Sequence, residues 1–161
     1  MRKILLPVVF CAILMAFSFC AKAQAELPRR TFFTEIDSLQ LAAPRPMVIF
    51  LHTDWCRYCQ NMKKTTLRDP DVNVLLNDHF YFLSLNAETE ETIIFGNQSF
   101  PFQPTGNGTG AHTLATAIGT INDQLQYPTL VIMNENYEII FQYGAFIPAD
   151  MFLNILAATL K

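Results

Sequence analysis

The sequence predicts an α/β fold in which helices flank a mixed central β-sheet. Two short apolar runs, residues 47–51 and 80–85, are separated by a stretch of helical periodicity, which is the order of a βαβ unit. Further along, the runs 129–133 and 138–143 are rich in β-branched and aromatic residues and flank a four-residue turn, as in an antiparallel hairpin. A parallel pair and a hairpin within one sheet would make that sheet mixed.

Length and composition limit the function classes. The chain has 161 residues, the length of one domain, and its 51% hydrophobic residues are enough for a packed core. A net charge of −3 provides no basic surface for nucleic acid. We therefore expect a single globular domain with no nucleic-acid partner.

The N-terminus has the pattern of an export signal. Arg2 and Lys3 precede an apolar run over residues 4–21, and small residues then frame a cleavage site at Ala23, so residues 1–23 are predicted to be a signal peptide. The alternative is an N-terminal membrane anchor, since 18 mostly apolar residues are just long enough to cross a bilayer. Either way, the domain works outside the cytoplasm, in the periplasm or another extracytoplasmic space.

Setting aside the export segment changes the charge balance. Eight basic residues then remain against 14 acidic ones, a net charge of about −6. An acidic surface argues against anionic partners.

The first half of the domain contains most of the predicted helices. A polar linker over residues 24–31 leads to an amphipathic helix over 32–43, which two prolines end. A second helix starts at Arg57, after the first apolar strand. Asp69 can cap a third helix, with Pro70 in its first position.

Residues 87–110 interrupt this pattern with acidic residues, prolines and four glycines. We expect a long flexible loop here, and such loops are usually functional or mobile. The glycines do not lie between a strand and a helix, so they do not match a phosphate-binding motif. The segment from Glu88 to Gly110 is a candidate element for partner selection. Helices are predicted again over 111–121 and 151–160.

The cysteines point to reactivity rather than structure. Cys11 and Cys20 lie in the export segment, which leaves only Cys56 and Cys59 in the domain. A secreted domain stabilised by several disulfides would have its cysteines spread along the chain. A bridge across two residues constrains the unfolded chain far less than one that closes a long loop.

The position of Cys56 favours its thiolate form. It lies where a buried strand gives way to a helix, so the helix dipole and the neighbouring Arg57 both stabilise negative charge on its sulfur. Environments of this kind lower the pKa of a thiol from about 8.5 into roughly the 3.5–7.5 range. Cys56 is thus the predicted nucleophile, and Cys59, one helical turn further on, is the predicted resolving thiol.

Two other function classes remain open. His52, Cys56 and Cys59 could bind zinc or copper with three ligands, which would make the protein a metal handler. The domain could also be a non-catalytic binding module. Our prediction assigns no metal ligand and no bound cofactor.

Two motifs resemble the thioredoxin family. One is Trp55-Cys56-Arg57-Tyr58-Cys59 after an apolar strand, and the other is Tyr127-Pro128-Thr129 before a hairpin and last helix. The resemblance covers residues 32–161. Within it, Thr53-Asp54-Trp55-Cys56 and Asp69-Pro70-Asp71-Val72 most resemble exported thioredoxin-like proteins and the soluble domain of membrane thiol:disulfide interchange proteins.

This resemblance implies a thioredoxin-like fold with a loop insertion before the helix that precedes a cis-proline. Cys56 and Cys59 would form the redox disulfide and carry the catalysis. Pro128 would be the cis-proline facing them, and Tyr127 would offer backbone hydrogen bonds to an extended substrate; an ordinary proline at a strand start is the alternative. The substrate-binding surface would also include Trp55, Arg57 and Tyr58, although Trp55 could instead be a core aromatic residue.

The sequence also departs from the family. Many thioredoxins have a buried carboxylate six residues before the first cysteine, where this chain has Phe50. The nearest titratable substitutes are His52 and Asp54. Arg57 and Tyr58 replace the familiar Gly-Pro dipeptide, so the redox potential of cytosolic thioredoxin does not transfer.

The sequence as a whole leads us to expect an exported, monomeric thiol-disulfide oxidoreductase. Its partners would be protein thiols or disulfides and a membrane or soluble electron donor. The resemblance to the interchange domain favours reduction.

Overall fold

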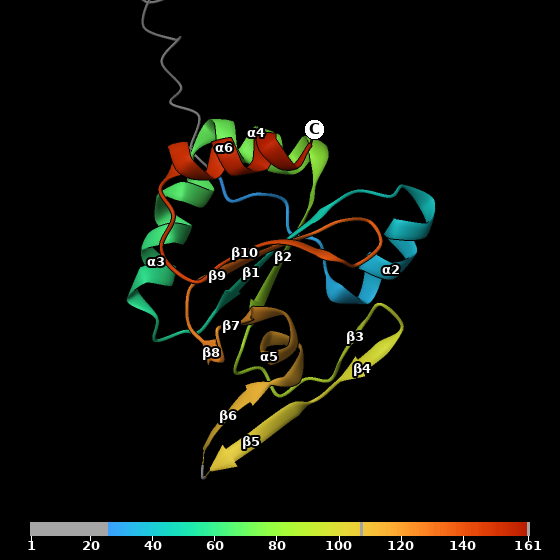
Figure 1. Ribbon diagram of the computed structural model, residues 1–161, viewed down its shortest axis with the longest axis vertical. Coiled ribbons are helices and arrows are strands. Elements are labelled where there is room, and N and C mark those ends of the chain that lie inside the picture. The colour runs from blue at the N-terminus through green and yellow to red at the C-terminus, as the bar shows by residue number, and fades with distance from the viewer. Residues whose placement is uncertain (1–25, 107, 161) are drawn as a thin grey trace, which may run out of the picture.

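The computed structural model describes residues 26–106 and 108–160, and the predicted signal peptide lies outside these ranges. The core is a four-stranded sheet with strand order β10-β9-β1-β2 (Figure 1). β1 pairs parallel to β2 and antiparallel to β9, and β9 pairs antiparallel to β10, so the predicted mixed sheet is confirmed. The strands of this sheet are β1 (Met47–His52), β2 (Tyr81–Asn86), β9 (Thr129–Met133) and β10 (Ile139–Tyr143).

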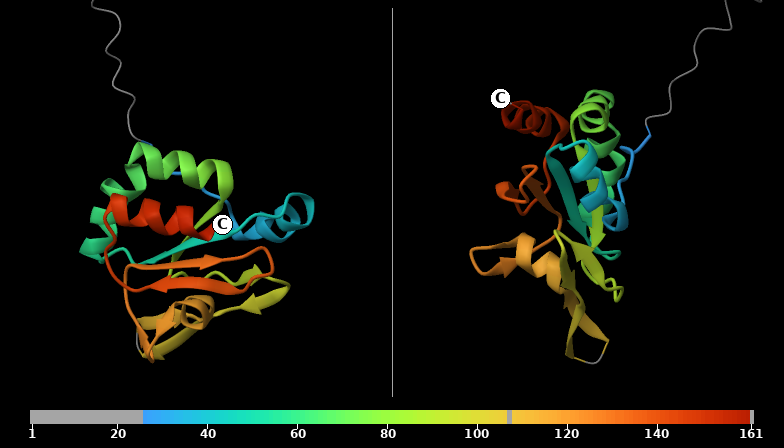
Figure 2. Two further views of the ribbon diagram at one scale, coloured as in Figure 1. Left: turned by 45° about the horizontal axis from the view of Figure 1, so that its top comes forward. Right: turned by 90° about the vertical axis from the view of Figure 1, so that its right-hand side faces the viewer.

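Helices cover both faces of the sheet. α3, the short 3₁₀ helix η1 and α4 connect β1 to β2, which is the predicted βαβ crossover. α4 and α6 lie together on one side of the sheet, while α5 and the remaining strands lie on the other (Figures 1 and 2). The helices are α2 (Phe33–Ala42), α3 (Arg57–Lys64), η1 (Thr66–Arg68), α4 (Pro70–His79), α5 (Thr113–Gly119) and α6 (Ala149–Thr159).

β1 is the centre of the core, and all six of its residues are buried. Because successive strand residues point to opposite faces, Val48 and Phe50 join a cluster with α3, α4 and α6. Met47, Ile49 and Leu51 join a second cluster with α2 and α5 on the other face. The result is a three-layer α/β/α arrangement.

The N-terminal segment predicted as a linker runs along the folded domain. Arg30 forms a parallel β-bridge with Phe82, and the Thr31 amide donates to the Phe82 carbonyl over 2.7 Å. The Arg29 amide donates to the side-chain oxygen of Asn77 on α4. Residues 29–31 are therefore attached to the edge of β2.

The prediction of a flexible loop over residues 87–110 is wrong, because the segment contains two β-hairpins. One is formed by β3 (Ile93–Phe95) and β4 (Gln98–Phe100), and the other by β5 (Phe102–Gly106) and β6 (Thr109–His112). A third, minimal hairpin, β7 (Thr120–Ile121) with β8 (Gln124–Leu125), precedes the cis-proline. None of these strands is long enough to give a clear alternating pattern.

Tertiary contacts hold the β3–β4 hairpin in place. Its turn has Gly96 and Asn97 at φ values of 59° and 60°, as a type I′ turn requires. The carboxylate of Asp37 on α2 accepts hydrogen bonds from both of these amides and from the hydroxyl of Tyr137. Burial opposes ionisation of Asp37, but these three donors outweigh it and hold its pKa below the usual value.

Two buried histidines contribute polar groups to the core. His52 ends β1, where it is 8% exposed and its ring stacks on Phe50. His112 is fully buried and caps α5: its Nδ1 accepts from the Leu114 amide, and its Nε2 lies 3.0 Å from the Glu91 carbonyl. Burial lowers the pKa of both histidines, that of His52 to about 4 with a further contribution from Lys63. Both are therefore neutral at pH 7.

None of the helices in the described part of the chain is both long and apolar enough to span a membrane.

Removing the Asp69 carboxylate is expected to destabilise the fold. Asp69 caps α4 by accepting from the amides of Asp71 and Val72, both over 3.1 Å. Asp69→Ala should lower the free energy of unfolding by about 1 kcal/mol in urea titrations of the oxidised protein. Asp71→Ala removes the same charge without a capping bond and should cost less than about 0.5 kcal/mol. Equal losses in the two variants would contradict this role for Asp69.

Acid is expected to destabilise the protein through its buried histidines. As the pH falls from about 6.5 towards 4, the unfolded chain binds a proton at His52 that the folded chain excludes, so stability falls over this range. The difference in unfolding free energy between pH 7 and about pH 4.5 should include roughly 2 kcal/mol from His52. His52→Gln should reduce this acid loss, and the exposed His79→Gln should leave it as in the wild type. The same loss in all three proteins would exclude His52 as its source.

Candidate active site

The two cysteines lie where β1 passes into α3. Cys56 is the N-cap residue of α3, and its Sγ accepts a hydrogen bond from the Cys59 amide over 3.0 Å. Cys56 and Cys59 form a disulfide, with their Cα atoms 5.2 Å apart. The helix start thus directs a backbone N–H at the sulfur of Cys56, which favours negative charge there once the disulfide is reduced.

The two cysteines differ in their access to solvent. Cys56 is 4% exposed, whereas Cys59 is completely buried. Both belong to the core cluster between the sheet and α3, α4 and α6. Of the two cysteines, only Cys56 keeps any exposed area.

Aromatic side chains surround the exposed side of the disulfide. Trp55 is 67% exposed, which excludes the alternative that it is a core residue. Its indole N–H donates to a carboxylate oxygen of Glu88 over 2.9 Å, and its ring meets Tyr127 edge to face at 6.2 Å. Arg57 and Tyr58 are exposed on the first turn of α3. These side chains form a surface around Cys56 rather than part of the core.

The Tyr127–Pro128 peptide bond is cis, as the sequence resemblance implies. Pro128 is buried at the start of β9, and Tyr127 packs against the cluster that contains both cysteines. Burial, with a contribution from Glu88, raises the pKa of Tyr127 to about 12. Its phenol therefore stays neutral beside the disulfide.

Phe50, at the position where many thioredoxins have a carboxylate, lies on the same face of the sheet as the cysteines. Polar groups lie close to it. The Lys63 ammonium lies 3.3 Å and 3.4 Å from the two ring nitrogens of His52 and 5.8 Å from the centre of the Phe50 ring. Burial is the main cause of a lowered pKa at Lys63 as well. Asp54 is exposed in the loop after β1. His52 is thus the neutral base on the cysteine side of the sheet.

Sequence reasoning missed Lys63 and Glu88 as residues near the site. Lys63 follows Cys59 by four positions on one helix, a spacing that puts the two on the same face. Glu88 comes two residues after β2, and the carboxyl ends of the parallel strands β1 and β2 lie at the same edge of the sheet. The spacing of Lys63 from Cys59 and the position of Glu88 after a strand can both be read in the sequence. Their meaning depends on how α3 packs and on the pairing of β1 with β2, which only the fold establishes.

The donors required for metal handling are not gathered at the cysteines. Among residues 26–106 and 108–160, no group of three His, Cys, Asp or Glu side chains is arranged to hold a metal ion. Both nitrogens of His52 lie next to the ammonium of Lys63, whose charge opposes a cation there.

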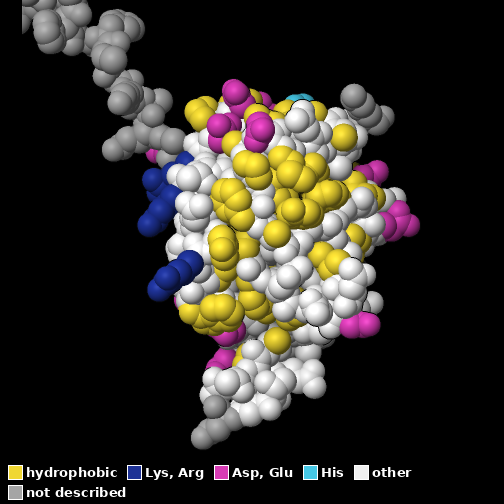
Figure 3. Space-filling view, turned by 60° about the vertical axis from the view of Figure 1, so that its left-hand side comes forward, with side chains coloured by type: hydrophobic (Ala, Val, Ile, Leu, Met, Phe, Trp, Pro, Cys, Tyr) yellow, Lys and Arg dark blue, Asp and Glu magenta, His cyan; other side chains and the backbone are white. Residues whose placement is uncertain are grey.

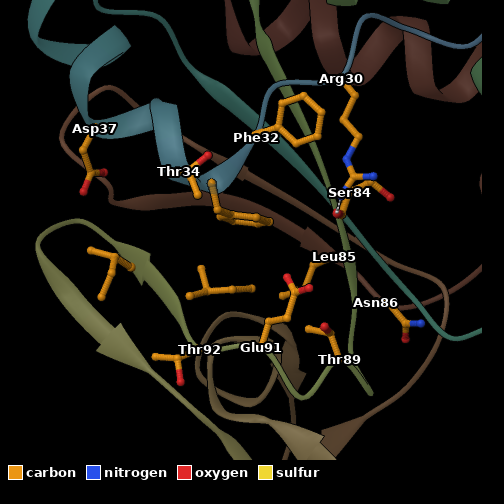
Figure 4. A pocket seen from close by; sticks show the side chains of 13 residues that line it. Arg30, Phe32, Thr34, Asp37, Ser84, Leu85, Asn86, Thr89, Glu91 and Thr92 are labelled. Carbon is orange, nitrogen blue, oxygen red and sulfur yellow. Dashed lines mark hydrogen bonds between the residues drawn. The ribbon is translucent and has the colours of Figure 1, made fainter.

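The surface has a pocket whose lining includes no residue near the disulfide and a groove whose lining includes Trp55. A pocket of about 400 Å³ lies between α2 and the strands β2 and β3, and it is lined by Arg30, Asp37 and Glu91 among others but by neither cysteine (Figure 4). A groove of about 620 Å³ lies between Trp55 and the β5–β6 hairpin. Only the groove shares a residue with the surface around Cys56.

Comparison with known proteins identifies the family. A family model described as a thioredoxin-like domain matches residues 32–160. No curated protein matches the sequence significantly.

Solved structures share the fold at low sequence identity. A thioredoxin from Thermus thermophilus aligns with a TM-score of 0.58 and 22% identity over 84% of this chain and 88% of that one. A protein described as DsbH oxidoreductase aligns with a TM-score of 0.57 and 13% identity over 86% and 88%. The reduced C-terminal domain of DsbD from Neisseria meningitidis aligns with a TM-score of 0.52 and 19% identity over 78% and 90%.

Three observations support the same family and activity. The family model spans most of the chain, the α/β/α architecture matches, and a Cys-x-x-Cys disulfide lies at a helix start. The chain belongs to the thioredoxin-like family and is a thiol-disulfide oxidoreductase.

Proposed function

We propose that this oxidoreductase reduces disulfides of proteins outside the cytoplasm, with Cys56 as the attacking thiol and Cys59 as the resolving thiol. The observation that carries the proposal is the asymmetry of the pair: Cys56 caps α3 and is 4% exposed, while Cys59 is completely buried. Only Cys56 can therefore make the first contact with a second molecule.

The reaction consists of two thiol-disulfide exchanges. In the reduced protein, the Cys56 thiolate attacks one sulfur of a substrate disulfide, forms a mixed disulfide and expels the first substrate thiolate. Cys59 then loses its proton, which solvent or the departing substrate thiolate can take up, and attacks the Cys56 sulfur. This step expels the second substrate thiolate and closes the Cys56–Cys59 disulfide, so two electrons pass to the substrate.

Substrate binding is assigned to the residues around Cys56. The backbone of Tyr127, held by the cis bond to Pro128, would pair with an extended substrate segment, while Trp55, Arg57 and Tyr58 would contact its side chains. The exposure of these last three residues supports this role, because they are free to meet a partner. No bound cofactor is required, since the cysteines themselves hold the electrons.

The export segment predicted from the sequence and the resemblance to membrane interchange domains support an extracytoplasmic reductase. Such a protein needs a donor, a membrane or soluble protein dithiol, to reduce its own disulfide after each cycle. We propose that it works as a monomer after cleavage at about residue 23, or anchored there if the segment is retained.

Replacing each cysteine separately is expected to separate their roles. Cys56→Ser should abolish reduction of a protein disulfide such as that of insulin, whereas Cys59→Ser should trap a mixed disulfide between Cys56 and the substrate. Turbidity of insulin measures the first effect, and non-reducing electrophoresis with mass spectrometry detects the second. Wild-type activity in Cys56→Ser would indicate a non-catalytic binding module, and trapping through Cys59 would reverse the assigned roles.

The redox potential is expected to be that of a reductase. Equilibration with dithiol and glutathione buffers, read by alkylation of Cys56 and Cys59, should give a potential nearer to about −270 mV, as in thioredoxin, than to the value of about −120 mV for the oxidant DsbA. A potential near that of the oxidant would refute the proposed direction but not the exchange chemistry.

A further inference from the structure

Beside the disulfide, a groove of about 620 Å³ separates Trp55 from the β5–β6 hairpin. This volume is within the range of about 300–1,000 Å³ seen for binding pockets. Trp55 and the acidic residues Glu88 and Glu90 line one side. Residues of the hairpin, including Phe102, Pro104 and Gly110, line the other. Trp55 belongs both to the groove and to the surface around Cys56.

Charge in this groove is of one sign. Among the residues that line it, Glu88 and Glu90 are charged and none is basic. The sequence strengthens this asymmetry, because residues 69–160 contain no Lys or Arg. Figure 3 shows acidic side chains where the hairpin leaves the body of the molecule. The visible face of the hairpin carries no Lys or Arg, and the basic side chains in this view lie along the left edge of the body.

The groove is also fixed in position relative to Cys56. One oxygen of the Glu88 carboxylate accepts the Trp55 indole N–H over 2.9 Å, which couples the start of the insertion to the residue before the nucleophile. At the hairpin, Gly110 packs so closely under Phe102 that a Cβ atom would overlap the Phe102 ring. Gly110 therefore lines the groove with backbone alone, since there is no room for a side chain at this position.

The hairpin leaves backbone groups for a partner. Within the described residues, β5 and β6 form sheet pairs only with each other. The His112 amide at the end of β6 donates to the Ala87 carbonyl over 2.7 Å, and Pro104 in β5 has no N–H, so the groups left for a partner are those of the other residues along the two outer edges. An extended polypeptide can add hydrogen bonds at such an edge. A small disulfide would use neither this edge nor the length of the groove.

We propose that this groove docks an extended segment of a disulfide-bearing protein that carries Lys or Arg beside its reacting cysteine. The inference rests on the proposed function and specifies its substrate class. Glu88 and Glu90 attract the basic side chain, Trp55 packs on its aliphatic part, and the hairpin pairs with the segment while its sulfur meets Cys56.

The test measures second-order rates of the reduced full-length protein with three disulfides that share a leaving group. Two are extended peptides, identical except for Lys or Glu on both sides of a cysteine capped as a 2-pyridyl disulfide. The third is neutral 2-hydroxyethyl 2-pyridyl disulfide. Attack by Cys56 releases pyridine-2-thione, which is followed by its absorbance. Each peptide rate is divided by the small-disulfide rate of the same protein.

The wild type should react about fivefold faster with the Lys peptide than with the Glu peptide at low salt, and high salt should largely remove this preference. Glu88→Gln/Glu90→Gln should reduce the ratio to near one, while Glu26→Gln/Glu135→Gln removes the same charge elsewhere and should retain it. Glu90→Gln alone, which leaves the Trp55 contact intact, should reduce the ratio part of the way.

Equal normalised rates for the two peptides in the wild type would overturn the groove as a docking site, as would a preference that survives the Glu88→Gln/Glu90→Gln change. Failure of the wild type to react with the small disulfide would instead overturn the oxidoreductase chemistry on which the proposal rests.

Discussion

Burial of β1 on both faces is the constraint on which the rest of the structure depends. All six of its residues are enclosed between two helical layers, and it pairs with β2 on one side and β9 on the other. Burying large apolar side chains contributes about 1.5–3 kcal/mol each, so neither the register nor the end point of this strand can shift without a large loss. The chain leaves it at His52 and reaches Cys56 four residues later, so the core fixes the position of the cysteine pair.

The same constraint explains the asymmetry of the cysteines. α3 packs on the face that Val48 and Phe50 supply, and the residues on its inner side, Cys59 and Met62, are fully buried. Cys56, the N-cap residue of the helix, accepts the Cys59 amide at its sulfur and keeps 4% of its surface exposed. A helix that starts at the edge of a sheet provides one reachable and one protected sulfur.

The insertion after β2, residues 87–112, is attached to the common fold at two places. Asp37 holds the β3–β4 hairpin against α2, and Glu88 contacts Trp55 next to the disulfide. The β5–β6 hairpin, which follows both attachments in the chain, projects from the body and forms one side of the acidic groove (Figure 2). The common fold supplies the Cys-x-x-Cys disulfide at a helix start, and this chain's own insertion borders the groove proposed here to bind partners.

The sequence by itself determined the features that are local: the buried strand run, the Asp69 cap with Pro70, and the cysteine pair at a helix start. These depend on contacts within a few residues, and the family motifs added the cis bond before Pro128. The hairpins over residues 93–112 were missed because their strands are short and interrupted by Pro and Gly, even though Asn107-Gly108 is a dipeptide typical of tight hairpin turns. Only the tertiary structure decided that Trp55 is exposed, that Glu88 reaches it across 33 positions, and that Lys63 lies beside His52. Such contacts join residues far apart in the chain, and folding alone brings them together.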